Sequence, residues 1–331
     1  MRSLLTAIAL IIALIMALAP PAGAQPPDDA RSFPSRPIRI VVPFPAGGPT
    51  DVNLRIIAQK MSEDWKQPVI VENRPGGNTA IGAQVVAKAE PDGYTLLAAM
   101  DTTLVMNPAT ASAPLGYDPF KDFATITLTA KNTSLMTVRA DDGPANVAEL
   151  IARARASPGR MNYGAGIITT RLAGYMFARS AGIEVQLIPY KGSADVVQGL
   201  LTGSVDFIVD GVAASLPLIQ SGRLRALAKL NNRPLPVLPE LQPLAVAAGL
   251  PQLGDMSSWI GLVAPAGTPR GVIEKLAREV ADINRDPAVA DRLEKAGITP
   301  AISTPEEFDA FFRSEATRWT KAFKESGIKL E

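Results

Sequence analysis

The sequence predicts an α/β protein made of two units, each a mostly parallel sheet flanked by helices. Short apolar runs alternate with helical patterns along almost the whole chain, which is typical of parallel strands covered by helices on both faces. The pattern starts again near Ile126, and the length of 331 residues exceeds the usual size of one domain. We therefore expect two domains, the second inserted into the first.

The first unit begins with the run Ile38–Val42, which predicts a buried strand. From Leu54 onward, apolar residues recur at helical spacing and predict a helix. Further strands are expected at Pro68–Glu72 and Tyr94–Ala99, with a short helix between them that stops at the sequence PDG. Strands and helices thus alternate, as a parallel sheet requires.

The second unit repeats this alternation. An extended segment is expected at Ile126–Arg139, helices at Val147–Ala156, Thr170–Ser180 and Ala194–Leu201, and strands at MNYG (161–164), VQLIPY (185–190) and Val205–Asp210. A proline-rich passage at Asn231–Pro243 then interrupts the regular pattern.

The chain then resumes regular structure. The segment Ser257–Pro269 predicts a strand and a helix that has Thr268 at its N-cap and Pro269 at its first position. The last helix is expected to begin with a capping box formed by Thr304 and Glu307. Its apolar side, which we expect to pack in the core, consists of Phe308, Phe311, Phe312, Trp319 and Phe323.

The C-terminal helices have no long sheet of their own to cover, so we expect them to pack on the first unit. Lobe 1 would then comprise residues 33–130 and 260–331, and lobe 2 residues 131–259. Two extended segments, near Ile126–Arg139 and Ser257–Val263, would cross between the lobes. Ligands of such sheets bind beyond the carboxyl ends of the strands, where loops meet helix N-termini.

The N-terminus predicts export. Arg2, an uncharged run from Leu4 to Leu18 and the small residues at 22–24 form the pattern of a secretory signal peptide, which we expect to comprise residues 1–24 with cleavage after Ala24. A membrane anchor is the alternative, although the apolar run is short for a bilayer.

Composition excludes several classes of function. The chain has no cysteine and no histidine, which excludes thiol nucleophiles, a Ser-His-Asp relay and histidine-ligated metal sites. Export without disulfides suits a bacterial periplasm. The chain has 33 basic and 32 acidic residues, and this balance gives no electrostatic footprint for nucleic acid. We expect no metal, no cofactor and no nucleic-acid partner.

The sequence VVPFPAGGPTD lies between the first strand and the first helix. Gly47 and Gly48 can expose backbone N–H groups, and the helix dipole adds partial positive charge. No Gly-Lys-Ser/Thr follows, so a carboxylate fits this loop better than a nucleoside triphosphate. An ordinary tight turn with Thr50 as N-cap is the alternative.

Three more strand-end loops carry small or hydroxyl residues before a helix. Arg171 could contact a carboxylate or lie on the surface, and the same alternatives hold for Lys191. Asp210 could orient the pocket or cap a helix. The predicted ligand-binding residues are Pro45, Ala46, Gly47, Gly48, Thr50, Asp51, Thr102, Thr103, Gly166, Thr169, Thr170, Arg171, Gly192, Ser193 and Asp210. Because these loops come from both units, we expect one anion site between the lobes.

Several segments together resemble the Bug family, the TctC-like periplasmic receptors of tripartite tricarboxylate transporters. They are SRPIRIVVPFPAGGPTDVNLRIIAQKM, QPVIVENRPGGNTAIGAQVVAKAEPDGYTLL, YDPFKDFATIT, IPYKGSADVVQGLLTGSVDFIVDG, GRLRALA, SSWIGLVAPAGTP and the C-terminal helix from TPEEF. The resemblance covers about Phe33 to Glu331. It implies a two-lobed type II periplasmic binding protein, a Venus flytrap that passes its ligand to membrane subunits.

The resemblance also implies the ligand class, which is small carboxylates such as dicarboxylates, citrate-like acids, acidic amino acids and aromatic acids. One carboxylate would be held by backbone amides of Pro45–Asp51 and Gly164–Arg171. This chain has Thr170 and Arg171 where relatives have a Ser-His pair, and Pro49 where a small residue is common. Arg171 beside apolar neighbours would suit a second carboxylate on a hydrophobic spacer.

The expected function is therefore capture of a small carboxylate, with a dicarboxylate or aromatic carboxylate favoured, by a monomeric periplasmic protein that is not an enzyme. One alternative is an exported enzyme that uses Asp51 or Asp210 as a general base. The other is a receptor that presents its closed form to a signalling partner.

Overall fold

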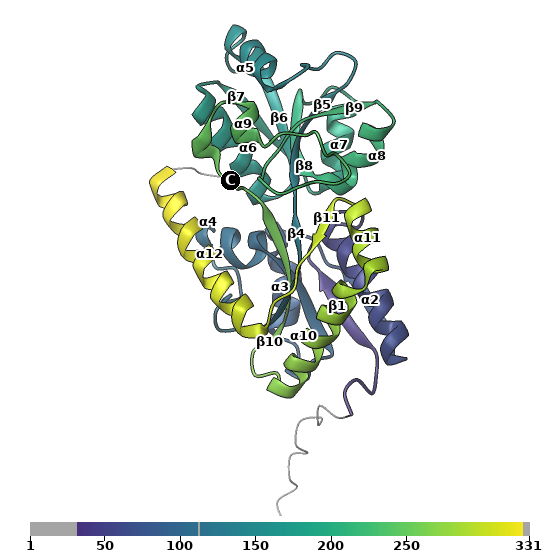
Figure 1. The fold of residues 1–331 in the computed structure, drawn as a ribbon. Coiled ribbons are helices and arrows are strands. Elements are labelled where there is room, and N and C mark those ends of the chain that lie inside the picture. Colours follow the sequence, from purple (N-terminus) through teal and green to yellow (C-terminus); the bar gives the residue numbers. More distant parts are fainter. Residues whose placement is uncertain (1–31, 112, 327–331) are drawn as a thin grey trace, which may run out of the picture.

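The computed structural model describes residues 32–111 and 113–326 and shows two lobes arranged along one long axis (Figure 1). The six-stranded sheet of lobe 1 contains, in spatial order, β11 (Ile298–Pro300), β4 (Phe123–Asn132), β10 (Ser258–Pro265), β3 (Thr95–Met100), β1 (Ile38–Val42) and β2 (Val69–Asn73). The five-stranded sheet of lobe 2 contains β7 (Val185–Pro189), β6 (Met161–Ala165), β8 (Phe207–Gly211), β5 (Ser134–Arg139) and β9 (Leu224–Lys229).

Helices flank both sheets. Those of lobe 1 are α2 (Pro49–Trp65), η1 (Gly77–Thr79), α3 (Ala80–Ala87), the π-helical turn η2 (Thr102–Met106), α4 (Asn107–Thr110), α10 (Arg270–Arg285), α11 (Pro287–Lys295) and α12 (Pro305–Ser326). Those of lobe 2 are α5 (Val147–Ala156), α6 (Ile168–Ala181), α7 (Ser193–Leu201), α8 (Val212–Gln220), α9 (Leu244–Ala247) and η3 (Pro251–Leu253).

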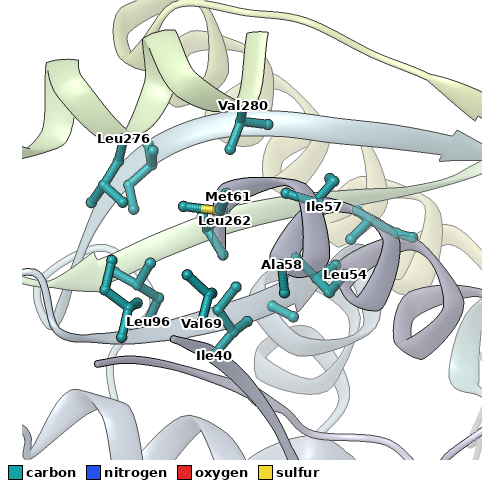
Figure 2. Packing of buried hydrophobic residues seen from close by; sticks show 14 of the residues in the cluster. Ile40, Leu54, Ile57, Ala58, Met61, Val69, Leu96, Leu262, Leu276 and Val280 are labelled. Carbon is teal, nitrogen blue, oxygen red and sulfur yellow. The ribbon is translucent and has the colours of Figure 1, made fainter. Parts of the chain in front are cut away.

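The core of lobe 1 follows from the helical spacing of apolar residues in α2. Figure 2 shows this face of α2 against the sheet, with α10 packed on the same side; the labelled side chains are Ile40, Leu54, Ile57, Ala58, Met61, Val69, Leu96, Leu262, Leu276 and Val280. Full burial of a large aliphatic side chain contributes about 1.5–3 kcal/mol relative to exposure, so this face anchors α2, and with it the loop that precedes α2.

The core of lobe 2 is centred on an aromatic group. Phe207 of β8 stacks on Tyr163 of β6 with ring centroids 5.5 Å apart, and it meets Phe177 of α6 edge-on at 6.4 Å. Such aromatic pairs contribute beyond the area they bury. This cluster fixes α6, and therefore the loop between β6 and α6, on the second sheet.

Both sheets are mixed, whereas we expected them to be mostly parallel. In lobe 1, β1 is parallel to β2 and β3, but β10 is antiparallel to β3 and β4. In lobe 2, β6 is parallel to β7 and β8, but β5 is antiparallel to β8 and β9. The antiparallel strands belong to the crossing segments, because a chain that leaves a lobe and returns must run in both directions.

The chain changes sheets at the two predicted crossing segments. β4 and β5 are separated only by Thr133, yet they lie in different sheets. On the return, the Met256 N–H donates to the Leu230 carbonyl at 2.9 Å, and Ser258 then pairs with Asn132 in the first sheet. The exact lobe limits, 33–130 plus 260–331 and 131–259, stay a prediction.

Two predicted helix starts have different outcomes. The capping box of α12 is confirmed, because the Thr304 N–H donates to Glu307 at 2.8 Å and the Glu307 N–H donates to the Thr304 hydroxyl at 3.1 Å. The predicted cap of α10 is wrong: Pro269 is the N-cap, and the helix begins at Arg270. The Thr268 hydroxyl instead donates to the Pro265 carbonyl at 2.8 Å, so it stabilises the preceding turn.

Within residues 32–111 and 113–326, the helices lack the length and hydropathy that crossing a membrane would require. The predicted signal peptide, residues 1–24, lies outside the described residues.

Candidate functional site

A cavity of about 40 Å³ lies at the junction of the lobes, and we refer to it as the first cavity. It is lined by Phe44, Pro45, Gly48, Pro49, Thr50, Met100, Asn132, Ser134, Gly166, Ile167, Thr170, Gly192, Ser193, Asp210, Gly211 and Ser258. These residues come from the ends of β1 and β3 in lobe 1, from the loops before α6, α7 and α8 in lobe 2, and from both crossing segments.

Three helices begin at this cavity. Their first backbone bonds run from Val52 N to Gly48 O, from Arg171 N to Ile167 O, and from Val196 N to Gly192 O, at 3.0, 3.0 and 3.1 Å. The N–H groups that precede these donors have no acceptor within the helix, and each helix start carries partial positive charge. The cavity therefore offers main-chain donors from both lobes to an anion without placing a basic side chain there.

Two buried polar side chains of the first cavity carry atoms that lack partners within the described chain. Both side-chain atoms of Asn132, which is 3% exposed, and Oδ2 of Asp210 accept or donate no hydrogen bond. An unmade bond at such a site costs about 1–3 kcal/mol. A polar ligand would supply the missing partners, so these groups indicate a binding site.

Asp210 is the single acidic residue that the described part of the chain contributes to the lining of the first cavity. The Ser193 hydroxyl donates to its Oδ1 at 3.0 Å, and burial raises the pKa of Asp210 to about 7. Near neutral pH the carboxyl group is therefore protonated in part of the population. In that form it can donate a hydrogen bond to an anionic oxygen, whereas the ionised form repels one.

The glycine loop after β1 is held by Asp51. This carboxylate accepts from Gly47 N at 3.0 Å, from Asn73 Nδ2 at 2.9 Å and from Arg55 Nε at 3.0 Å. Burial raises the pKa of Asp51, but these hydrogen bonds outweigh burial and hold the pKa below its usual value. Asp51, like Ala46 and Gly47, does not line the cavity and instead shapes the loop that does.

A second cavity, of about 430 Å³, adjoins the first. It is lined by Pro43, Phe44, Pro45, Pro75, Gly76, Gly77, Asn78, Thr79, Thr102, Gly166, Ile167, Arg171, Tyr190 and Lys191. Four of these residues, Phe44 and Pro45 of lobe 1 and Gly166 and Ile167 of lobe 2, also line the first cavity. Within the described ranges, the lining of the second cavity thus contains two basic residues and no acidic one.

Arg171 is half-buried and lines the second cavity. Its Nη2 donates to the carbonyls of Gly166 and Tyr190 at 3.2 and 3.3 Å, while its Nε has no partner within the described chain. Burial lowers the pKa of Arg171 from its usual value. Lys191 lines the same cavity but is exposed.

The predicted threonine pairs separate in the structure. Thr170 lines the first cavity and Thr102 the second, whereas the Thr169 hydroxyl lies 3.3 Å from the Thr102 hydroxyl and bridges the lobes. Thr103 is buried and lines neither cavity; its carbonyl accepts a hydrogen bond from Tyr117 at 2.6 Å.

Sequence reasoning missed two groups of lining residues. Asn132, Ser134 and Ser258 lie inside extended segments, where no loop marks them. The loop Pro75–Thr79 follows β2 with a glycine pair before a helix, the same arrangement as in the loop after β1, and this pattern could have identified it.

In the described part of the chain, no cluster of three or more acidic residues could hold a metal ion. The first cavity brings one carboxyl group together with main-chain donors, an amide and hydroxyls. Such a set can bind and orient an organic acid.

Comparison with known proteins agrees with this geometry. Residues 53–328 match the family model TctC, described as tripartite tricarboxylate transporter family receptor. The chain is similar to the protein BugT of Bordetella pertussis, with 31% identity over 97% of this chain and 98% of that protein.

Two solved structures from Rhodopseudomonas palustris are similar over nearly their full length. One is Rpa4515 with adipate, at 33% identity, a TM-score of 0.85, and coverage of 89% of this chain and 99% of that one. The other is MatC with bound malate, at 28% identity, a TM-score of 0.79, and coverage of 87% and 99%.

Proposed function

Because this chain belongs to the TctC family of tripartite tricarboxylate transporter receptors, we propose that it captures a small carboxylate between its lobes and delivers it to the membrane subunits of such a transporter. A dicarboxylate or an aromatic carboxylate is the favoured ligand. The observation that carries the proposal is that three helix starts share one cavity with Asn132 and Asp210, which carry buried polar atoms without partners in the described part of the chain.

The ligand class is supported by two similar receptors. Their structures are described with adipate and with malate, which are both dicarboxylates. We propose that one acid group of the ligand occupies the first cavity, where it accepts hydrogen bonds from the N-termini of α2, α6 and α7. In a site from which water is excluded, each such bond is stronger than it would be in water.

We propose binding without chemical change, with closure of the lobes about the crossing segments. The alternative of an exported enzyme with Asp51 or Asp210 as general base finds little support in the geometry. Asp51 is already bonded to Arg55, Asn73 and Gly47 and does not line the cavity, and Asp210 faces it without a second carboxyl group. We further propose a periplasmic monomer, exported by a signal peptide cleaved after Ala24; a signalling receptor is the alternative use of the same closure.

The proposal can be tested by thermal unfolding of the mature chain in the presence of candidate ligands. The panel would contain dicarboxylates of four to eight carbons, citrate, aromatic mono- and dicarboxylates, and amino acids. A ligand at about a hundredfold excess over its dissociation constant should stabilise the fold by about 2.7 kcal/mol. A panel in which only compounds without an acid group stabilise the protein would contradict the proposal.

The variant Asn132→Leu gives a matched control for this experiment. Leucine has a similar size and removes two buried polar atoms that lack partners within the described chain, so the ligand-free variant should be as stable as the wild type or more stable by about 1–3 kcal/mol. The shift caused by ligand should be lost, because the ligand would then leave its own polar groups unpaired. An unchanged ligand shift in this variant would place the acid elsewhere.

A further inference from the structure

We propose that the second cavity is a second anion subsite, which binds the distal acid group of a dicarboxylate whose proximal acid group lies in the first cavity. This inference rests on the proposed function, since it assumes that an acid group binds in the first cavity. It adds where the second acid group of the ligand binds and which residues select that group.

The first argument is a charge without a counter-charge. Arg171 lines the second cavity, yet its guanidinium contacts only two carbonyls, and its Nε lacks a partner within the described chain. Among the residues that the structure describes, no acidic one lines this cavity. Charged groups withdrawn from water are normally paired in proteins, so a carboxylate from a ligand would complete the environment of Arg171.

The second argument is the loop Gly76–Thr79, which lies at the same cavity. Its four residues all have positive φ, with values of 128, 56, 48 and 83°. For Asn78 and especially for the β-branched Thr79 this conformation is strained, and such strain concentrates at ligand-binding sites. The Asn107 Nδ2 donates to the Asn78 carbonyl at 2.9 Å and holds the loop in this conformation.

The same loop presents an unused polar group. Thr79 is 4% exposed and lines the second cavity, and its hydroxyl has no partner within the described chain. Thr79 is also the residue before α3, but its hydroxyl makes no capping bond there. The hydroxyl is therefore available for an acid group that Arg171 neutralises.

The third argument is the passage between the cavities. The four residues that line both are Phe44, Pro45, Gly166 and Ile167, two from each lobe, and none carries a polar side chain. An alkyl chain or a ring can pack in such a passage, whereas hydroxyl groups on a spacer would lose hydrogen bonds to water. The ligand class is therefore a dicarboxylate with an apolar spacer.

The test compares dicarboxylates with the matching monocarboxylates by titration calorimetry. Unbranched diacids and monoacids of four to eight carbons would be titrated into the wild type, Arg171→Gln and Arg179→Gln. Arg179 lies on the same helix, is exposed and lines neither cavity, so its variant controls for the loss of one positive charge.

We expect the wild type to prefer the best diacid over its monoacid. Arg171→Gln should weaken diacid binding by about tenfold to hundredfold, the range for a charge-assisted hydrogen bond, and change monoacid binding less than about threefold. Arg179→Gln should change neither. Thr79→Val, which keeps the shape and removes the hydroxyl, should weaken only the diacid, by about three- to tenfold.

Different results would contradict the second subsite and the proposed function. If monoacids bind as tightly as diacids and Arg171→Gln affects both equally, the second subsite is wrong while the proposed function stands. If no acid of either series binds the wild type, the proposed function falls and the second subsite falls with it. If Arg171→Gln does not fold, which circular dichroism would show, Thr79→Val replaces it in the test. Weaker binding of the diacid alone then supports the second subsite, and an equal effect on both acids contradicts it.

Discussion

The two cavities at the junction of the lobes share four residues but differ in how they can attract an anion. The first, of about 40 Å³, offers helix starts, an amide, hydroxyls and one carboxyl group. The second, of about 430 Å³, is lined by Arg171 and Lys191 and by no acidic residue of the described chain. In the first the attraction comes from fixed main-chain dipoles, and in the second it comes from charge.

This difference suggests a division of roles between two ends of one ligand. Main-chain donors in a small space fit one acid group and leave little room for anything else, so they select a chemical group. A larger, cationic space next to an apolar passage selects what lies at the other end. Substitutions in the first cavity should therefore affect monoacids and diacids alike, whereas substitutions in the second cavity should affect mainly diacids.

The largest expected effect comes from preventing the lobes from meeting. A Cβ at Gly211 of lobe 2 would lie 2.6 Å from Pro49 Cγ of lobe 1, so Gly211→Ala should hold the lobes apart. Because both cavities need both lobes, diacids and monoacids should both lose about tenfold to hundredfold in affinity, the range for overpacking. Titration calorimetry would measure this loss.

Pro49→Ala provides the rescue, because it removes the atom that the new methyl group meets. The double variant should recover most of the affinity for both kinds of acid. If Gly211→Ala weakened only diacids, or if Pro49→Ala failed to rescue it, the contact between the lobes would not be the cause.

A smaller effect should follow pH and should belong to the first cavity alone. Asp210 must be protonated to donate to a bound carboxylate, and its pKa is about 7. Affinity should therefore be flat from about pH 5, above which the acid groups of the ligand are ionised, to about pH 7, and it should fall by up to about tenfold per pH unit above pH 7. Arg171 keeps its charge over this range, so monoacids and diacids should show the same profile.

Asp101 is the matched control for the pH experiment. Burial raises its pKa to about 7 as well, although hydrogen bonds from the Thr102 backbone and the Thr169 side chain oppose this, and Glu315 and Arg318 act on it at longer range. It lines neither cavity. Asp210→Asn should flatten the affinity profile, whereas Asp101→Asn should keep it; the reverse result would exclude Asp210 as the donor.

The same two groups affect folding stability with a defined sign. Their pKa values near 7 in the folded chain exceed the usual 3.8. Their stabilising contribution to the free energy of unfolding is therefore fully present below pH 3.8 and is lost as the pH rises to about 7. Stability and affinity must for this reason be measured separately.

The smallest effect is expected for Lys191. It lines the second cavity, but it is exposed, and exposed ion pairs are weak and screened by salt. Lys191→Met should weaken diacid binding by about threefold or less, and this difference should vanish when the ionic strength is raised from about 0.01 M to about 1 M. A loss as large as that of Arg171→Gln would mean that Lys191, and not Arg171, is the main cation of the cavity.

Local sequence patterns were sufficient for most elements of the fold. The strand Ile38–Val42 and the capping box of Thr304 and Glu307 were predicted as they occur, because side-chain periodicity and caps depend on near neighbours. The mixed pairing was not predictable in this way. Trp259, for instance, pairs with Lys131, a partner far away in the sequence that only the crossing of the chain brings alongside.

The candidate site was predicted at the level of loops but not of side chains. Successive residues of a helix point about 100° apart, so Thr170 faces the first cavity while Thr169 faces Thr102. No spacing in the sequence shows which of the two lies inside. Asn132 and Ser134 could not be found at all, because only the change of sheet at Thr133 places them at the cavity.

The single residue between β4 and β5 has a mechanical consequence. Asn132 and Ser134 flank Thr133 and line the first cavity, so a bound ligand would contact the chain where it passes from one sheet to the other. The displacement caused by a small rotation at this point grows with distance from it, so the ends of the two lobes farthest from Thr133 would move the most. A membrane protein that contacts those ends would then distinguish the ligand-bound receptor from the free receptor without contacting the ligand itself.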